Sequence, residues 1–196
     1  MAGFPFDTVG FDLDGTLVDT APDLCRAVNH ALSTIGRPPL SEEATREVIG
    51  GGTRAMLTRA LERTGGTVDE ERFQQLYLSL IDHYERHTSE HSAPYPGCLA
   101  ALDALAARGC RLAVATNKQE HLARKLLDEA LRLTGGTRLA MVGDSSFDVR
   151  AARAAEAPVV VLTAGYHDAP PEALGADALI DGFDELVAAL ERLGPG

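Results

Sequence analysis

The chain has few cysteines and few basic residues, and each shortage argues against a class of protein. Cys25, Cys98 and Cys110 are widely spaced and form no CxxC pair. An odd number of such cysteines is typical of reduced thiols in a cytoplasmic protein. Lysine and arginine total 18 against 29 aspartate and glutamate residues, so the net charge is −11. Because nucleic acids and anionic membranes present phosphates, we expect neither as a partner.

Targeting signals and membrane-spanning segments are also missing from the sequence. The first ten residues contain no lysine or arginine and no long apolar run, which predicts no signal peptide. No apolar segment is long enough to cross a bilayer. Hydrophobic residues still make up 45% of the chain, enough for a substantial core. We therefore expect a cytoplasmic protein, either a monomer or a homodimer.

Continuous apolar runs alternate with helical stretches over much of the chain. Such runs between helices are typical of buried parallel strands. The alternation predicts an α/β fold with a doubly wound, Rossmann-like parallel-sheet core. The expected strands are residues 6–12, 110–116, 138–144 and 158–163, and the expected helices are residues 98–109, 119–133, 146–156 and 182–193.

A long helical segment interrupts this alternation after the first predicted strand. Apolar residues recur at helical spacing through most of it, and "APYPG" at residues 93–97 marks its end with two prolines and a glycine. We expect a core made of residues 1–17 and 94–196 and a helical insertion at residues 18–93. The insertion's expected helices are residues 21–36, 41–49, 53–66 and 69–87, with Ser41 as an N-cap.

Polar side chains follow three of the predicted core strands. In an open parallel sheet, ligands bind beyond the carboxyl ends of the strands. If these strands are neighbours, their carboxylates converge and repel one another, and Mg²⁺ would remove that conflict. The alternative is that these residues only cap the helices that follow. They are Asp12 and Asp14 after the first strand, Thr116 and Asn117 after the second, and Asp144 and Asp148 after the third.

Three stretches resemble signature motifs of the haloacid dehalogenase superfamily: "FDLDGTLVDT", "VATN" and "MVGDSSFD". The opening "FDLDGTLVDTAPDL" is similar to that of the phosphoglycolate phosphatase branch, and the resemblance covers nearly the whole chain. Within it the D-x-D-G-T-x-x-D pattern is the most specific signal. The resemblance implies a Mg²⁺-dependent phosphomonoesterase. Its substrate would be a small phosphorylated acid or sugar, with 2-phosphoglycolate as the first candidate.

The resemblance also implies roles for the carboxylates. Asp12 would attack phosphorus and become an aspartyl phosphate, and Asp14 would protonate the leaving oxygen and then activate water. Asp12 and Asp144 would bind Mg²⁺ through their side chains and Asp14 through its main-chain carbonyl, while Asp148 would support the metal shell. Gly15 lets the chain turn away without a side chain in the crevice.

Substrate contacts are expected from two places. Thr116 and Asn117 would bind the phosphoryl oxygens, as the resemblance implies. The insertion resembles the helical cap of such enzymes, and its "GGGTR" stretch at residues 50–54 brings Arg54 to a position where it could pair with a substrate carboxylate. The alternative for this stretch is an interhelical turn with a solvated arginine.

Three histidines, His83, His87 and His91, recur four residues apart on a predicted helix. This spacing could form a metal-binding face, but among acidic neighbours it is more often a solvated stripe.

The lysine that such enzymes use to bind phosphate is missing from its usual place. No Lys-Pro pair occurs between "VATN" and "GDS", and the interval is too short for a helix, a strand and a second helix. Either the natural protein carries a further stretch there, which we favour, or the chain is truly shorter and must use Lys118 or Lys125. An unbroken helix through Asp128 and Glu129 would support the second explanation.

Two other functions remain open at this point. A phosphoglucomutase-like enzyme would return the phosphoryl group to a sugar, and a non-catalytic relative would only bind phosphate. A 2-haloacid dehalogenase is disfavoured because enzymes of that kind lack the second aspartate, Asp14.

Overall fold

The computed structural model describes residues 3–115 and 138–194. Contacts divide the chain into two compact units. One holds the residues up to Val18 together with those from Pro94 onward, and the other is Asp19–Ala93. In the described ranges we find no helix long and apolar enough to cross a membrane.

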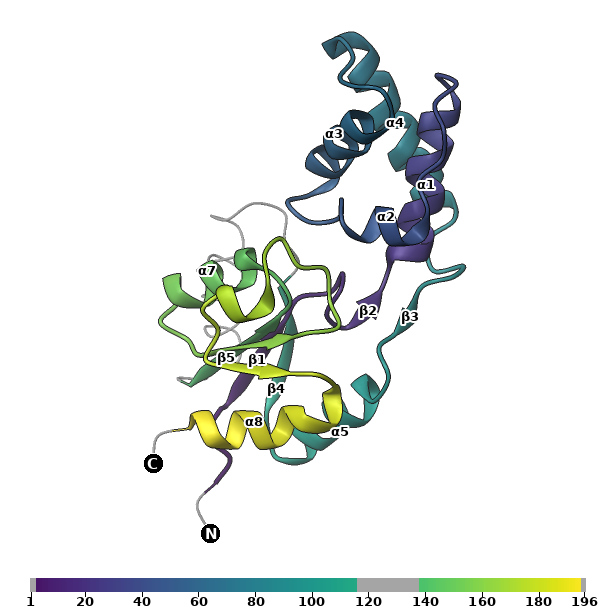
Figure 1. Cartoon of the computed structure of the whole chain (residues 1–196). Helices are drawn as coiled ribbons and strands as arrows, with labels where there is room; N and C mark the ends of the chain where they lie inside the picture. The colour runs from purple at the N-terminus through teal and green to yellow at the C-terminus, as the bar shows by residue number, and fades with distance from the viewer. Residues whose placement is uncertain (1–2, 116–137, 195–196) are drawn as a thin grey trace. The chain divides into compact units, whose positions relative to one another are not determined.

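The first unit is built on a five-stranded parallel sheet, in the order β4-β1-β5-β6-β7 (Figure 1). Its helices lie on both faces, which confirms the predicted doubly wound α/β fold. The strand β1, second in this order, pairs with β4 on one side and with β5 on the other. The strands are β1 (Thr8–Phe11), β4 (Arg111–Val114), β5 (Leu139–Gly143), β6 (Val159–Leu162) and β7 (Ala178–Ile180).

The continuous apolar runs are explained by two hydrophobic cores, one on each face of the sheet. Side chains alternate between the faces along a strand. Val142 of β5 belongs to the core with helices α5 (Cys98–Ala107) and α8 (Leu186–Leu193), whereas its neighbour Met141 belongs to the core with α7 (Ser146–Ala154). Every residue of β5 and β6 is therefore buried.

Two elements at the end of the chain differ from the prediction. The strand β7 was not expected, because three residues are too few to form a recognisable apolar run. The helix predicted at residues 182–193 begins with the 3-10 turn Phe183–Glu185, and the α-helix starts only at Leu186. Another 3-10 turn, Pro171–Ala173, lies between β6 and β7.

The second unit is helical and has its own hydrophobic core. Leu32 of α1, Leu57 of α3 and Leu80 of α4 are completely buried in it. Ser41 caps α2 as predicted, since its side chain accepts a hydrogen bond from the backbone N–H of Ala44. The helices are α1 (Ala21–Ser33), α2 (Glu42–Arg46), α3 (Thr53–Thr64) and α4 (Glu70–Arg86).

Two short strands, β2 (Val18–Asp19) and β3 (Ala93–Pro94), pair where the chain passes from one unit to the other. The returning segment is held by Asp23 of α1. Its buried carboxylate accepts hydrogen bonds from the backbone N–H groups of His91 and Ser92 and from the Ser92 hydroxyl.

Candidate active site

Strand register brings two of the predicted carboxylates to the same edge of the sheet. Phe11, the last residue of β1, pairs with Val142 of β5. Asp12 follows directly, and its backbone N–H donates to the Val142 carbonyl at 2.9 Å. Asp144 follows the end of β5 in the same way. Adjacent parallel strands in register therefore place Asp12 and Asp144 side by side.

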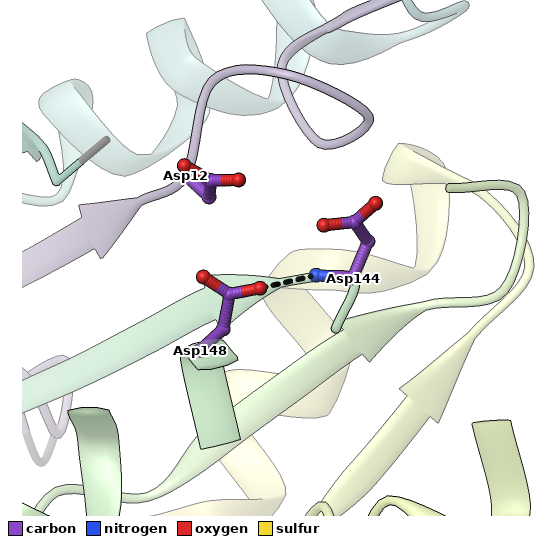
Figure 2. Close-up of side chains that lie close together, drawn as sticks. All are labelled: Asp12, Asp144 and Asp148. Atoms are coloured by element: carbon purple, nitrogen blue, oxygen red, sulfur yellow. Dashed lines mark hydrogen bonds between the residues drawn. The ribbon is translucent and has the colours of Figure 1, made fainter. Parts of the chain in front are cut away.

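A third carboxylate, that of Asp148, joins them from the first turn of α7 (Figure 2). One oxygen of each of the three side chains lies within 4.8 Å of the others. All three residues are buried, with relative exposures of 6%, 2% and 3% for Asp12, Asp144 and Asp148. In the described part of the chain, no other group of acidic, histidine or cysteine side chains meets this criterion.

The cluster is electrostatically strained when it holds no cation. Burial is the largest cause that raises the pKa of the Asp144 carboxyl well above its usual value, and repulsion from Asp148 and Asp12 adds to it. Hydrogen bonds from the Tyr166 N–H and the Thr16 hydroxyl lower the pKa by less. Burial also raises the pKa of Asp148, although Ser145 and Asp144 donate hydrogen bonds to it. A divalent cation with oxygen ligands would relieve both effects, so these residues fit a hard metal ion.

Asp148 also organises the loop that carries Asp144. Its Oδ2 accepts hydrogen bonds from the Ser145 hydroxyl at 2.6 Å, the Ser145 N–H at 3.0 Å and the Asp144 N–H at 3.2 Å. Figure 2 shows the last of these bonds and the approach of the three carboxylates. Asp148 thus caps the start of α7 and belongs to the acidic cluster as well.

Three glycines allow the backbone to pass close to these side chains. A Cβ atom on Gly143 would lie 2.3 Å from the Cβ of Asp148, and one on Gly165 would lie 2.3 Å from the Cβ of Asp144. Gly15 would place a Cβ 2.3 Å from Asp144 Oδ2, and its φ of +84° also favours glycine. Any larger residue at these positions would have to displace a carboxylate.

The model of the family described as haloacid dehalogenase-like hydrolase matches residues 9–134.

The chain belongs to the haloacid dehalogenase-like hydrolase family.

Curated relatives and solved structures agree with this assignment. The phosphoglycolate phosphatase of Caulobacter vibrioides is 37% identical, over 90% of this chain and 87% of its own. That of Agrobacterium fabrum is also 37% identical, over 92% of this chain and 90% of its own. The crystal structure of a predicted phosphoglycolate phosphatase from Haemophilus somnus superposes with a TM-score of 0.82 at 27% identity. It covers 94% of this chain and 97% of that one.

The alignments with both relatives contain gaps in this chain. The Caulobacter alignment runs over 206 positions and the Agrobacterium alignment over 210, although this chain has only 196 residues. Both relatives therefore have residues at positions where this hydrolase has gaps.

Asp14 of this hydrolase is half-buried and forms an isolated β-bridge with Val18. Among the described residues, the compact acidic cluster consists of Asp12, Asp144 and Asp148, so the Asp14 carboxylate lies outside it. Its roles as proton donor and as main-chain metal ligand stay predictions. Two residues further on, the buried Thr16 hydroxyl donates to Asp144 Oδ1 at 3.4 Å, a contact that the sequence did not indicate.

Arg54 is engaged within the helical unit. Its guanidinium donates to Glu70 and Gln74 of α4, at 3.0 Å in each case, and lies 4.7 Å from the centre of the Phe73 ring. The side chain is still 52% exposed. The predicted contact with substrate stays a prediction, and it would have to compete with these partners.

His83 of α4 and His87, directly after it, form a ring stack with His30 of α1. His83 lies 4.4 Å from His30 of α1 and 4.5 Å from His87, measured between ring centroids. The His30 and His83 rings are stacked, with 30° between their planes, and the His83 and His87 rings are tilted by 34°. The backbone of His91 binds Asp23, as described above. This arrangement gives the hydrolase no evident second metal site in the described residues.

Several predicted site residues lie outside the described residues. They are Thr116 and Asn117, the two lysines Lys118 and Lys125, and the Asp128–Glu129 position.

Proposed function

We propose that this hydrolase is a Mg²⁺-dependent phosphomonoesterase that acts on a small phosphorylated acid or sugar, with 2-phosphoglycolate as the first candidate. The observation that carries the proposal is the cluster of Asp12, Asp144 and Asp148. Its three buried carboxylates lie within 4.8 Å of one another at the carboxyl edge of the sheet. The names of the curated relatives support the phosphatase class and suggest the substrate.

Asp12 is the nucleophile of this mechanism. A carboxylate oxygen attacks phosphorus, the bond from phosphorus to the leaving oxygen breaks, and an aspartyl phosphate forms. Asp14 gives its proton to the leaving oxygen. It then takes a proton from the water that attacks phosphorus, which releases inorganic phosphate and regenerates Asp12. An aspartate two residues after the nucleophile points the same way along an extended chain.

Asp12 and Asp144 would hold the metal ion through their side chains, with Asp148 supporting them and the Asp14 main-chain carbonyl as a further ligand. When bound, Mg²⁺ offsets the negative charge that otherwise keeps a carboxylate away from a phosphate. Mg²⁺ usually binds to one or two carboxylates and keeps several waters, which suits this small cluster.

The phosphoryl oxygens would be bound by Thr116 and Asn117. The positive charge that the family usually takes from a lysine would come from a further stretch of the natural protein between "VATN" and "GDS" or, if the chain is truly shorter, from Lys118 or Lys125. Three free cysteines are in keeping with a reducing, cytoplasmic setting.

Hydrolysis of p-nitrophenyl phosphate with Mg²⁺, and with EDTA in its place, tests the proposal. Turnover that requires Mg²⁺ is expected. No turnover under either condition would leave a protein that only binds phosphate. A panel of phosphorylated metabolites then compares 2-phosphoglycolate with sugar phosphates. Transfer of phosphate to a sugar in place of water would favour the phosphoglucomutase-like alternative.

A further inference from the structure

The segment Tyr166–Asp168, between β6 and β7, makes three successive contacts with the loop that carries Asp144. We call this segment the 166–168 clamp. The backbone N–H of Tyr166 donates to Asp144 Oδ2. The His167 ring contacts the Asp144 carbonyl, and the Asp168 carboxylate binds Ser146. None of the three residues belongs to the motifs that indicated the family.

These contacts complete a set that holds every polar group of Asp144. Its backbone N–H donates to Asp148 at 3.2 Å, and its carbonyl accepts from His167 Nδ1 at 2.6 Å. Its Oδ1 accepts from the Thr16 hydroxyl at 3.4 Å, and its Oδ2 accepts from the Tyr166 N–H. Two of these four contacts come from the 166–168 clamp.

The His167 ring connects the ends of two neighbouring strands. Nδ1 lies 2.6 Å from the carbonyl oxygen of Asp144, directly after β5, and Nε2 lies 2.8 Å from that of Thr163, directly after β6. A carbonyl oxygen can only accept, so a ring nitrogen that carries a hydrogen donates to the carbonyl that it faces, and the tautomer sets which nitrogen does so. The ring therefore fixes the distance between the two loops at the site.

Asp168 holds the next part of the same loop. Its Oδ1 accepts from the Ser146 N–H at 2.9 Å and its Oδ2 from the Ser146 hydroxyl at 2.5 Å. Ser146 is the first residue of α7, the helix that carries Asp148. Asp168 thus anchors the start of that helix from outside, while its own side chain stays exposed.

We propose that the 166–168 clamp holds Asp144 in the position that binds the metal ion, so that His167 and Asp168 are positioning residues for the reaction. The inference rests on the proposed function. Three carboxylates this close repel one another, and an untethered Asp144 would turn away and have to be brought back on metal binding. Groups that orient metal ligands typically contribute about 10-fold to 100-fold to metal affinity.

Two substitutions of His167 separate its two contacts. The amide nitrogen of His167→Asn stands near the position of Nδ1 and can still donate to Asp144. That of His167→Gln stands near Nε2 and can donate only to Thr163. Asp168→Ala removes both bonds to Ser146 at an exposed position. Asp181→Ala is its matched control, since Asp181 is also exposed and accepts from a hydroxyl, that of Thr163 at 2.6 Å, and not from Ser146.

The measurement is Mn²⁺ binding by the 196-residue protein, followed by electron paramagnetic resonance without substrate. Mn²⁺ prefers the same oxygen ligands as Mg²⁺. We expect the dissociation constant to rise about tenfold in His167→Gln and Asp168→Ala, and to stay within about threefold of the wild type in His167→Asn and Asp181→Ala. The KM for p-nitrophenyl phosphate at saturating metal should not change in any of them.

Equal Mn²⁺ affinity in the wild type, His167→Gln and Asp168→Ala would overturn the inference and leave the proposed function intact. An equal loss in Asp168→Ala and Asp181→Ala would also overturn it, because charge alone would then explain the effect. A wild type that binds no Mn²⁺ would overturn the proposed function itself. If His167→Gln does not fold, Asp168→Ala decides the matter, since its side chain is exposed.

Discussion

Asp144→Asn should stabilise the metal-free protein at neutral and alkaline pH, although it removes a metal ligand. Because the pKa of the Asp144 carboxyl is raised in the folded state, the folded protein binds a proton that the unfolded chain releases. Stability therefore falls as pH rises from the unfolded pKa of about 3.9 through the raised folded pKa. Asparagine keeps the shape of the side chain without its charge, so the variant should lose less stability over this range.

The size of the expected gain in stability follows from the distance between the carboxylates. Two unit charges 4.8 Å apart repel each other by about 3 kcal/mol at an effective dielectric constant of about 20. The amide can still accept from the Tyr166 N–H, and the Thr16 hydroxyl can turn and accept from the amide, so few hydrogen bonds are lost. Relief of one repulsive pair should raise the Tm by about 6 to 12 °C in a chain of this size.

Thermal unfolding followed by circular dichroism, between pH 5 and pH 8.5, measures this effect. In EDTA the Tm difference between Asp144→Asn and the wild type should grow with pH. With Mg²⁺ it should shrink or reverse, because the ion stabilises only a protein that binds it. Asp103→Asn, which removes an exposed charge from α5, is the control. A Tm difference that does not depend on pH, or an equal effect in Asp103→Asn, would refute the reasoning.

Three further substitutions test the site. Asp12→Asn should lower turnover by several powers of ten with an unchanged circular dichroism spectrum; more than about a tenth of wild-type activity would rule Asp12 out as the nucleophile. Asp14→Asn should slow the hydrolysis of alkyl phosphates more than that of p-nitrophenyl phosphate, whose leaving group needs no proton, and equal losses would argue against the proton-donor role. Gly165→Ala should displace Asp144, because the new Cβ would lie 2.3 Å from the Asp144 Cβ. Its Mg²⁺ affinity, measured by calorimetry, should fall about tenfold or more, and an unchanged affinity would contradict the geometry.

Much of the fold was predictable because a strand that is buried on both faces of the sheet appears in the sequence as a continuous apolar run. The runs at β5 and β6 contain no polar residue, since alternate side chains enter two different cores. The strand β7 left no such mark. Only Ile180 of its three residues is buried, and aspartates flank it on both sides.

The acidic cluster could be predicted from the sequence once the order of the strands in the sheet was assumed. Asp12 and Asp144 follow apolar runs, and only the assumption that these runs are neighbours was needed to bring them together. No pattern in the sequence indicated the contacts of Gly165 and His167 with Asp144, because these contacts depend on the path of the loop after β6. The pairing of Arg54 was hidden for a similar reason, since its partners lie on α4, one helix further along the chain.

The split of the sheet-bearing unit around Asp19–Ala93 has a consequence for biosynthesis. β1 pairs with β4 and β5, so its first partner begins at Arg111. At about 5 to 20 residues per second, a ribosome takes roughly 5 to 20 s to make the intervening chain. The helical segment is contiguous, has its own core and emerges within that interval. Once folded, it brings Val18 and Ala93 together through β2 and β3, so β1 closes a much shorter loop to reach β4. Shortening a loop fourfold saves on the order of 1 kcal/mol of closure entropy. Because the insertion is synthesised before β4, it can fold first and so lower the entropy cost of pairing β1 with β4.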